Sequence, residues 1–236
     1  MQEKKPFKQP PKKFHPQGLA ILYEDWDILV VDKEAGMLSV SSETSDESAQ
    51  ALLCEYVKKG NSKSKNRVLV VHRLEKEMSG ILVFAKTEPA KQFLQDKWAD
   101  FKKSYVAVVR GTPAEPQGVA TSFLAENSIH LMYSLPEPGE GKFARTAYQV
   151  LKSSAGYSLL NVNPMTERKN QARVHLADLG CPVVGDKKYG SKEKGIKRLC
   201  LHASAITLVH PFSKQEMTFE TPVPGYFNKL LKSTVE

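Results

Sequence analysis

The chain has 236 residues, of which 41% are hydrophobic and 25% are charged, a composition typical of a globular protein with one large domain or two small ones. The formal net charge of +8 favours a polyanionic partner such as RNA, although many basic proteins bind no nucleic acid. No apolar run approaches the roughly 20 residues that cross a bilayer, and no apolar segment follows the N-terminal lysines, so we expect neither a membrane span nor a secretory signal.

The first 17 residues alternate lysine and proline without apolar periodicity. This pattern predicts a flexible basic arm at residues 1–17, ahead of one catalytic domain at residues 18–236. The arm is either a solvated tail or a weak contact for RNA phosphates, and the sequence leaves both interpretations open.

Apolar periodicity predicts alternating strands and helices along the rest of the chain. We expect strands at residues 19–23, 27–32, 81–86, 103–111, 143–151, 157–162 and 217–220. We expect helices at residues 45–59, from Thr87 with Pro89 in its first turn, and at residues 225–231. Prolines and glycines at residues 112–142 indicate loop with one or two short strands.

The stretch with the clearest chemistry lies at residues 71–80 and has the sequence VHRLEKEMSG. Arg73 and Glu75 stand two residues apart, so in an extended chain both side chains point to the same side. Such a pair is more often a solvated ion pair than an active site. On residue types alone, both interpretations stay open.

Four ordered blocks of sequence resemble the RluA-type RNA pseudouridine synthases over about residues 18–224. Residues 71–80 resemble that family's H-R-L-D-x-x-T-S-G motif, with Glu75 in place of Asp and Met78 in place of Thr. The other blocks lie at residues 22–36, where L-Y-E-D precedes V-V-D-K, at residues 166–176, with TERKNQARVHL for the family's T-G-R-x-H-Q-I-R-x-H-L helix, and at residues 182–190, with PVVGDKKYG.

This resemblance implies an α+β fold with a mixed, mostly antiparallel sheet, a central cleft and flanking helices, and the strand-rich pattern agrees. It implies that the protein isomerises uridine to pseudouridine in RNA without a metal or other cofactor. The implied partner is ribosomal or transfer RNA. We expect a monomer that acts in the cytoplasm and does not bind membranes.

The resemblance also implies roles for individual residues. Glu75 would be the catalytic carboxylate, Arg173 the cation that pairs with it, and Tyr105 the phenol that packs on the target base. Arg73 matches the residue that enters the space left by the everted uridine, which must leave the stack to be reached. Further contacts to the RNA backbone are expected from basic residues in the later blocks, namely Arg168, Lys187 and Lys188.

Glutamate in place of aspartate leaves a second hypothesis open. One extra methylene moves a carboxylate by about 1.5 Å, and misplacement by about 1 Å can cost on the order of 100-fold in rate. The block at residues 166–176 also departs from the family, and Glu167 adds negative charge there. The chain is therefore a working synthase, a catalytically inactive RNA-binding relative that acts as a chaperone or assembly factor, or a basic protein with neither role.

Cysteine and histidine spacing predicts no metal site. The cysteines show no C-x-x-C spacing and indicate reduced core thiols: Cys54, Cys181 and Cys200. His202 and His210 have no ligand partners at useful spacing, so we expect them to make structural hydrogen bonds. Asp186 is expected to brace a loop rather than take part in chemistry.

Overall fold

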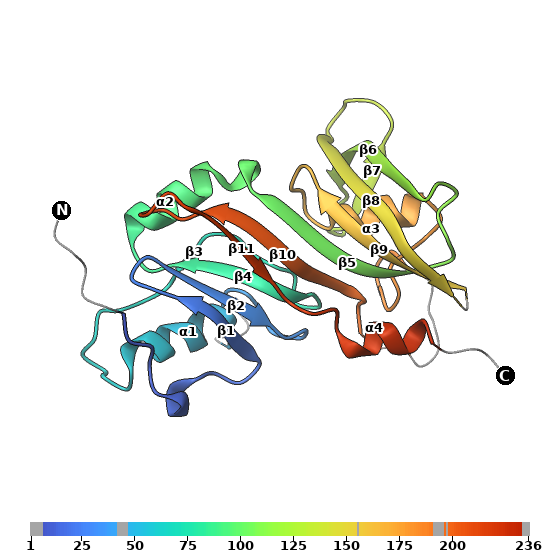
Figure 1. Cartoon of the computed structure of the whole chain (residues 1–236). Helices are drawn as coiled ribbons and strands as arrows, with labels where there is room; N and C mark the ends of the chain where they lie inside the picture. The colour runs from blue at the N-terminus through green and yellow to red at the C-terminus, as the bar shows by residue number, and fades with distance from the viewer. Residues whose placement is uncertain (1–6, 42–46, 155, 191–195, 197, 233–236) are drawn as a thin grey trace. The chain divides into compact units, whose positions relative to one another are not determined.

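The computed structural model describes residues 7–41, 47–154, 156–190, 196 and 198–232 (Figure 1). The chain folds into two compact units. Unit 1 comprises Met1–Phe101 and Thr207–Thr221, and unit 2 comprises Lys102–Ile206 and Pro222–Glu236. Both units combine antiparallel strands with a few short helices, so the expected α+β class with a mostly antiparallel sheet is confirmed.

Unit 1 is built on two buried central strands. The strand β2 (Ile28–Lys33) pairs with β1 (Leu19–Glu24) on one side and with β4 (Ser79–Ala85) on the other, and β3 (Leu69–Val70) pairs with β4. All seven residues of β4 are buried. A strand buried on both faces has an unbroken apolar run, which explains why residues 81–86 were recognisable from sequence.

The helices of unit 1 begin at the polar caps that the sequence offers. Ser48 accepts a hydrogen bond from the Ala51 amide at the start of α1 (Ala49–Lys58). Thr87 accepts one from the Ala90 amide at the start of α2 (Glu88–Asp96), as expected. The first residues expected in the α1 helix fall partly outside the described residues. Two single-turn 3₁₀ helices complete the unit, at Lys12–Phe14 and Trp98–Asp100.

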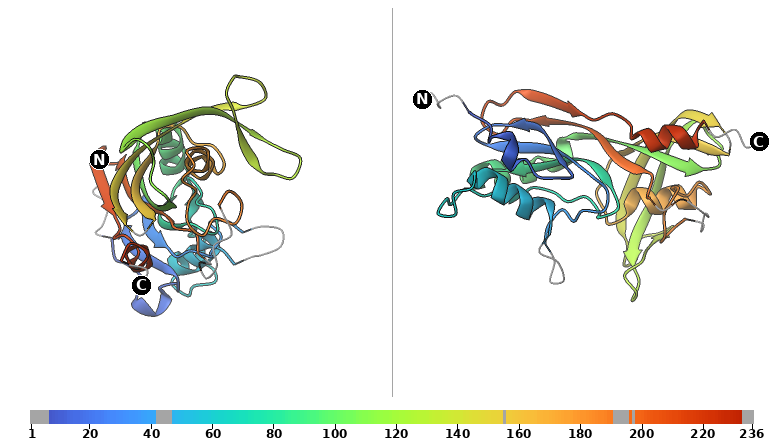
Figure 2. Two further views of the ribbon diagram at one scale, coloured as in Figure 1. Left: turned by 90° about the vertical axis from the view of Figure 1, so that its right-hand side faces the viewer. Right: turned by 90° about the horizontal axis from the view of Figure 1, so that it is seen from below.

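Unit 2 contains five antiparallel strands in the order β5 (Lys102–Arg110), β9 (Tyr157–Pro164), β8 (Lys142–Ser154), β6 (Gln117–Glu126) and β7 (Met132–Leu135). The strand β10 (Leu201–Val209) lies beside β5 and continues into unit 1, where β11 (Glu216–Glu220) pairs with it. The helix α3 (Gln171–Asp178) packs on the strands β6 to β9 (Figure 2), and α4 (Gly225–Leu230) follows β11.

Residues 112–142 are more regular than expected, because they hold the ten-residue strand β6 as well as β7. The prolines of this region lie before β6 and after β7 and interrupt neither strand.

The expected helix at residues 166–176 begins only at Gln171. Asn170 precedes it with a φ of 53°, in the left-handed region, which ends any helical run from the N-terminal side. Arg168 therefore lies in the loop before α3 and not on the helix.

Residues 7–17 make contacts with the rest of unit 1. Phe7 meets Trp26 edge to face at 5.4 Å, and His15 meets Tyr56 at 5.3 Å. Residues 1–6 lie outside the described residues, so the extent of the expected flexible arm and its boundary with the domain stay predictions. Among the residues that the structure describes, no helix has the length and apolar character to cross a membrane.

Candidate active site

The loop that carries Glu75 is held at its backbone. The Ser39 hydroxyl accepts a hydrogen bond from the Leu74 amide at 3.0 Å and donates one to the Leu74 carbonyl at 2.8 Å. On the other side, the Met78 amide donates to the Glu75 carbonyl at 3.1 Å and closes a turn. Glu75 itself is half-buried. The main chain is thus held by hydrogen bonds on both sides of Glu75, at Leu74 and at Met78.

A buried lysine holds the end of this loop. Lys33 is fully buried, and its ammonium donates to the carbonyls of Glu34, Met37 and Met78 at 3.0, 2.9 and 2.6 Å. Burial lowers the pKa of Lys33 to about 8, although the nearby Glu77 carboxylate partly opposes the shift. Three carbonyls satisfy the three N–H donors of the ammonium, so this charge ties the turn after β2 to the loop of Glu75.

His72 anchors the loop at its beginning. Its Nε2 atom accepts the Val83 amide hydrogen at 3.0 Å, and its ring stacks on Trp98 at 4.1 Å between centroids. An accepting Nε2 places the ring proton on Nδ1. Arg73 follows directly and is exposed, so the anchored histidine precedes an arginine that solvent can reach.

In unit 2, Tyr105 lies on β5 and is half-buried, opposite Val162 of β9. Two residues earlier, the buried ammonium of Lys103 lies 2.8 Å from a Glu167 carboxylate oxygen. The negative charge that Glu167 brings is therefore paired, and the pair ties the loop before α3 to the strand of Tyr105. Arg168 is exposed and donates to the carbonyls of Phe143 and Glu167.

Arg173 is held by a buried, bidentate ion pair. Its Nε and one terminal nitrogen lie 2.7 and 2.6 Å from the two carboxylate oxygens of Asp186, and both side chains are at most 4% exposed. The carboxylate also accepts the amides of Lys188 and Tyr189. Burial raises the pKa of Asp186, but the bonds from Arg173 and these amides outweigh it and lower the pKa. Asp186 thus braces a loop, as expected, and also fixes the guanidinium.

Two glycines allow the turn that carries Asp186. Gly185 has a φ of 74°, and a Cβ there would collide with the Arg198 carbonyl. A Cβ on Gly190 would lie 2.6 Å from the Asp186 carbonyl oxygen. Lys187 and Lys188 are exposed on this turn. The glycines of the PVVGDKKYG block therefore serve the close approach of backbones.

Three polar residues that match the family motif, Thr166, Gln171 and His175, take part in a hydrogen-bond network between α3 and β8. Thr166 accepts the Arg145 amide and donates to the Gln171 side chain, whose amide donates to Thr146. His175 is buried and bonds to Thr146 at 2.8 Å, and burial lowers its pKa. Sequence reasoning gave these residues no role, and the structure shows that they hold α3 against β8.

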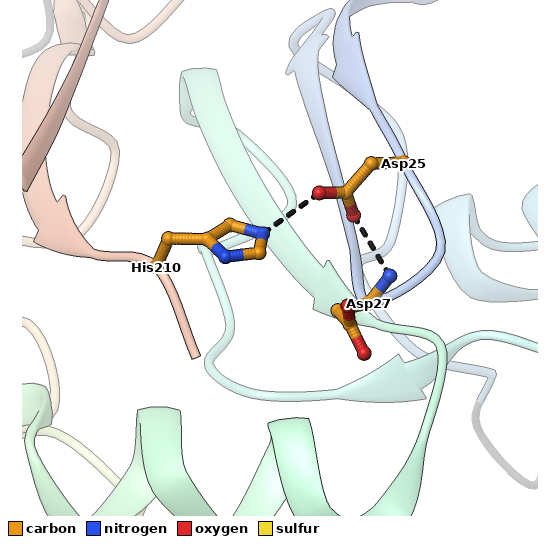
Figure 3. Close-up of side chains that lie close together, drawn as sticks. All are labelled: Asp25, Asp27 and His210. Atoms are coloured by element: carbon orange, nitrogen blue, oxygen red, sulfur yellow. Dashed lines mark hydrogen bonds and ion pairs between the residues drawn. The ribbon is translucent and has the colours of Figure 1, made fainter. Parts of the chain in front are cut away.

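Asp25, Asp27 and His210 form one cluster that could be considered for a metal, since their ligand atoms lie within 4.8 Å of one another (Figure 3). However, His210 Nε2 lies 2.7 Å from Asp25, and its Nδ1 accepts two backbone amides of the following turn. Asp25 also accepts the amides of Asp27 and Ile28. With both ring nitrogens engaged, the cluster favours the structural role expected for His210.

Comparison with known proteins assigns the fold and these motifs to one family. Residues 27–178 match the family model for RNA pseudouridylate synthase. The ribosomal large subunit pseudouridine synthase C of Rickettsia bellii is 32% identical over 217 residues, which are 89% of this chain and 70% of that protein. This chain belongs to the RluA-type RNA pseudouridine synthases. It is an RNA-modifying enzyme of the isomerase class.

Other members of the family agree with this assignment. The uncharacterized RNA pseudouridine synthase YhcT of Bacillus subtilis is 32% identical over 219 residues, which are 91% of this chain and 72% of that protein. The solved structure of human RNA pseudouridylate synthase domain containing 4 shares the fold, with a TM-score of 0.76 and 23% identity over 90% of this chain and 91% of that chain.

The residues expected in catalysis and in RNA binding lie in different units of this synthase. Glu75 and Arg73 belong to unit 1, whereas the others belong to unit 2: Tyr105, Arg168, Arg173, Lys187 and Lys188. The convergence of Glu75, Tyr105 and Arg173 on one nucleotide, and the RNA contacts of the remaining residues, stay predictions.

Proposed function

We propose that this synthase isomerises a uridine of ribosomal or transfer RNA, with Glu75 as its catalytic carboxylate. The observation that carries the proposal is the loop of Glu75, in which Ser39 and Lys33 fix the backbone on either side of a half-buried glutamate. Two relatives are named ribosomal large subunit pseudouridine synthases, C of Rickettsia bellii and D of Zymomonas mobilis, and these names favour ribosomal RNA.

The proposed reaction needs few groups. The target uridine leaves the base stack. Its N1–C1′ bond breaks, the uracil rotates and a C5–C1′ bond forms. The C5 proton then leaves to water and N1 takes up a proton, so the product is an isomer of the substrate. Glu75 acts as the nucleophile or stabilises the developing cation. The exposed guanidinium of Arg73, two residues away, fills the vacated stack or binds its phosphate.

Arg173 and Tyr105 complete the proposed site from unit 2. A guanidinium beside Glu75 keeps the carboxylate ionised and oriented, and Arg173 is suited to this because two of its five donors are already fixed by Asp186. Tyr105 packs on the flipped base. The proposed mechanism uses no metal or other cofactor.

The longer side chain of Glu75 fits this chemistry if the backbone lies further from the base than in enzymes with aspartate. The contacts of Ser39 and Lys33 hold that backbone position, and the longer side chain extends from it toward the base. Glu75→Asp is then expected to lower the rate by about 100-fold, because the carboxylate retracts by about 1.5 Å.

Tritium release from RNA labelled at uridine C5 tests the proposal. The RNA is taken from cells that lack the gene, so its target is unmodified. We expect release by the wild type, loss of release in Glu75→Ala with unchanged RNA affinity, and normal release in the matched variant Glu77→Ala. Normal release in Glu75→Ala would reject the role of Glu75. Release by Glu75→Asp but not by the wild type would reject native activity.

We also propose that the enzyme works as a monomer in the cytoplasm. Its three cysteines are free thiols, as is usual in a reducing compartment. Light scattering of the pure enzyme tests the monomer, and a dimer mass would contradict it.

A further inference from the structure

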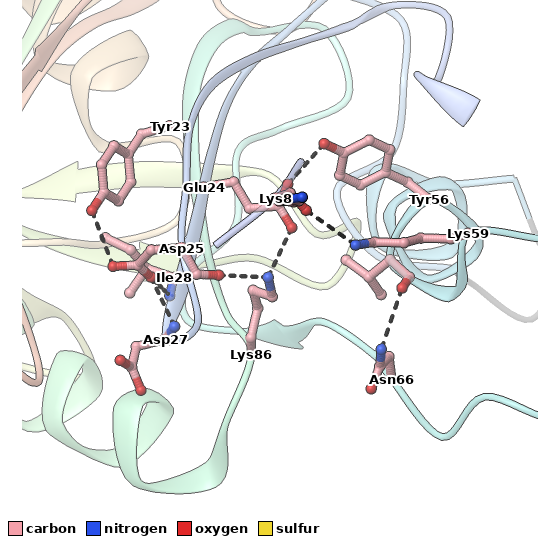
Figure 4. Close-up of polar contacts among 11 residues, drawn as sticks. Lys8, Tyr23, Glu24, Asp25, Asp27, Ile28, Tyr56, Lys59, Asn66 and Lys86 are labelled. Atoms are coloured by element: carbon pink, nitrogen blue, oxygen red, sulfur yellow. Dashed lines mark hydrogen bonds and ion pairs between the residues drawn. The ribbon is translucent and has the colours of Figure 1, made fainter. Parts of the chain in front are cut away.

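A cavity of about 430 Å³ lies wholly within unit 1 and is lined by residues outside the block at residues 71–80. Four cations and two aromatic side chains contribute to its lining: Lys8, Lys59, Arg67, Lys86, Phe7 and Trp26. The polar contacts around it connect the N-terminal residues, the end of α1 and the start of the segment after β4 (Figure 4). Neither the fold nor the proposed reaction accounts for this cavity.

The carboxylate in the lining is already paired. Glu24 has a side chain that is 1% exposed, and its two oxygens accept the Tyr56 hydroxyl and the Lys86 ammonium, each at 2.8 Å. Lys86 also donates to the Asp25 carbonyl and lies over the Phe7 ring at 4.1 Å. The pairing of Glu24 with Lys86 cancels their charges, so Lys8, Lys59 and Arg67 give the cavity an excess of positive charge.

Two of these cations stand at the ends of the basic segment that follows α1. Lys59 donates to the Lys8 carbonyl at 3.1 Å. Arg67 has a side chain that is 67% exposed and lies 3.5 Å from an exposed Glu88 oxygen. An exposed ion pair of this kind contributes little free energy, so the Arg67 guanidinium can exchange Glu88 for a phosphate.

An exposed aromatic residue accompanies the cations. Trp26 is 46% exposed although Phe7 meets it edge to face. A half-exposed indole beside positive charge is an arrangement that proteins use to bind unpaired nucleotides, with the base on the ring and the phosphate on the cation. The volume also lies within the roughly 300–1,000 Å³ typical of sites for small ligands.

We propose that this cavity binds one unpaired nucleotide of the substrate RNA, with its base stacked on Trp26 and its phosphates on Lys59 and Arg67. The inference rests on the proposed function only in taking RNA as the ligand. Such a contact holds substrate and transition state equally, so it affects KM and leaves kcat unchanged.

The experiment measures binding of a 12-nucleotide unpaired RNA, followed by tryptophan fluorescence and by anisotropy of a labelled RNA at several salt concentrations. The test variant is Lys59→Gln/Arg67→Gln. The control Lys97→Gln/Lys152→Gln removes the same charge from exposed lysines outside the cavity. Trp26→Phe reports the stacking, because Trp98 remains as the second tryptophan.

We expect the test variant to bind about 10-fold more weakly, and its slope of log affinity against log salt to fall by about 1.4, the value for two lost phosphate contacts. The control should stay within about 2-fold of the wild type. RNA should quench wild-type fluorescence and quench Trp26→Phe less. In the tritium assay the test variant should raise KM about 10-fold with kcat unchanged.

Equal affinities of the test and control variants would overturn the inference, as would uridine monophosphate binding as tightly as the 12-mer. If the wild type releases no tritium yet the test variant still loses RNA affinity, the proposed function fails and the cavity remains an RNA site. If the wild type releases tritium and the test variant matches the control, only the cavity proposal fails.

Discussion

The loop of Glu75 in unit 1 and the ion pair between Arg173 and Asp186 in unit 2 place charged side chains by opposite means. Glu75 is placed through its main chain, by hydrogen bonds from Ser39 and Lys33 that do not touch its carboxylate. Arg173 is placed through its guanidinium, by the buried carboxylate of Asp186. A substitution at Glu75 therefore leaves these loop contacts in place, whereas a substitution at Arg173 removes its ion pair with Asp186.

Breaking the Arg173 ion pair should have the largest effect. Asp186→Asn removes the buried carboxylate that pairs with the Arg173 guanidinium, so we expect a loss of about 3–5 kcal/mol in the free energy of unfolding. Urea denaturation measures it, and Asp100→Asn, which removes an exposed partner of Lys97, is the control with an expected loss of about 0–1 kcal/mol. Similar losses in both variants would contradict the comparison.

The Asp186 carboxylate also predicts a dependence on pH. Its folded pKa is lowered, so its contribution to stability is present above the unfolded pKa near 4 and is lost as the pH falls through the folded value. Asp186→Asn should therefore flatten the acid side of the curve of unfolding free energy against pH. A curve that keeps the wild-type shape would show that another group is responsible.

The second largest loss of stability is expected when the Lys33 ammonium, which binds the Met78 carbonyl at the end of the Glu75 loop, is removed. Lys33→Met leaves three carbonyls without their donor, so we expect a loss of about 2–4 kcal/mol near neutral pH together with reduced tritium release. Because the folded pKa is about 8 and the unfolded value is 10.5, the unfolded chain binds more protons between these values. The contribution of Lys33 to stability should then rise with pH by at most about 1.4 kcal/mol per unit.

Denaturation at a series of pH values from 7 to 10.5 measures this slope, taken as the difference between the wild type and Lys33→Met. A contribution of Lys33 that falls over this window would show that its folded pKa is not lowered.

A smaller effect is expected at the backbone anchor of Glu75. Ser39→Ala removes two hydrogen bonds to Leu74, so we expect a loss of about 1–2 kcal/mol in the free energy of unfolding and a decrease of about 10-fold in kcat. Ser213→Ala, whose hydroxyl makes one long bond in an exposed turn, should change neither quantity. A normal kcat in Ser39→Ala would mean that the loop keeps Glu75 in place without this anchor.

The smallest effect is expected at the pair between Lys103 and Glu167. Glu167→Gln leaves the Lys103 ammonium without its carboxylate, but Glu167 is 41% exposed, so water can replace it and the loss should be about 1 kcal/mol. Thermal unfolding detects a loss of this size as a shift of a few degrees. A loss as large as that of Asp186→Asn would remove the distinction between an exposed and a buried pair.

The strands and helix caps that depend only on residues close together in the chain could be predicted from the sequence. The apolar run of β4, the Thr87 cap of α2 and the strand pair β8 and β9 could be recognised because periodicity and capping are local signals. The start of α3 could not, because residues 166–169 contain good helix formers and only the left-handed conformation of Asn170 stops the helix.

The contacts that place the candidate residues could not be predicted either. Lys33 and the Met78 carbonyl are 45 residues apart, and Ser39 and Leu74 are 35 apart, so no local pattern records them. Glu75, Arg73, Tyr105 and Arg173 were recognised only through family motifs, and their meeting at one nucleotide stays a prediction. No sequence motif marks the cavity beside Trp26, because its cations come from three separate stretches of the chain.

The hydrogen bond between His210 and Asp25 spans 185 residues, and unit 1 takes its last strand, β11, from near the end of the chain. During synthesis on a ribosome, the first hundred residues therefore complete their unit only after β11 has emerged. Nascent chains released before β11 would lack that closure, which makes translation through β11 a requirement for a finished unit 1.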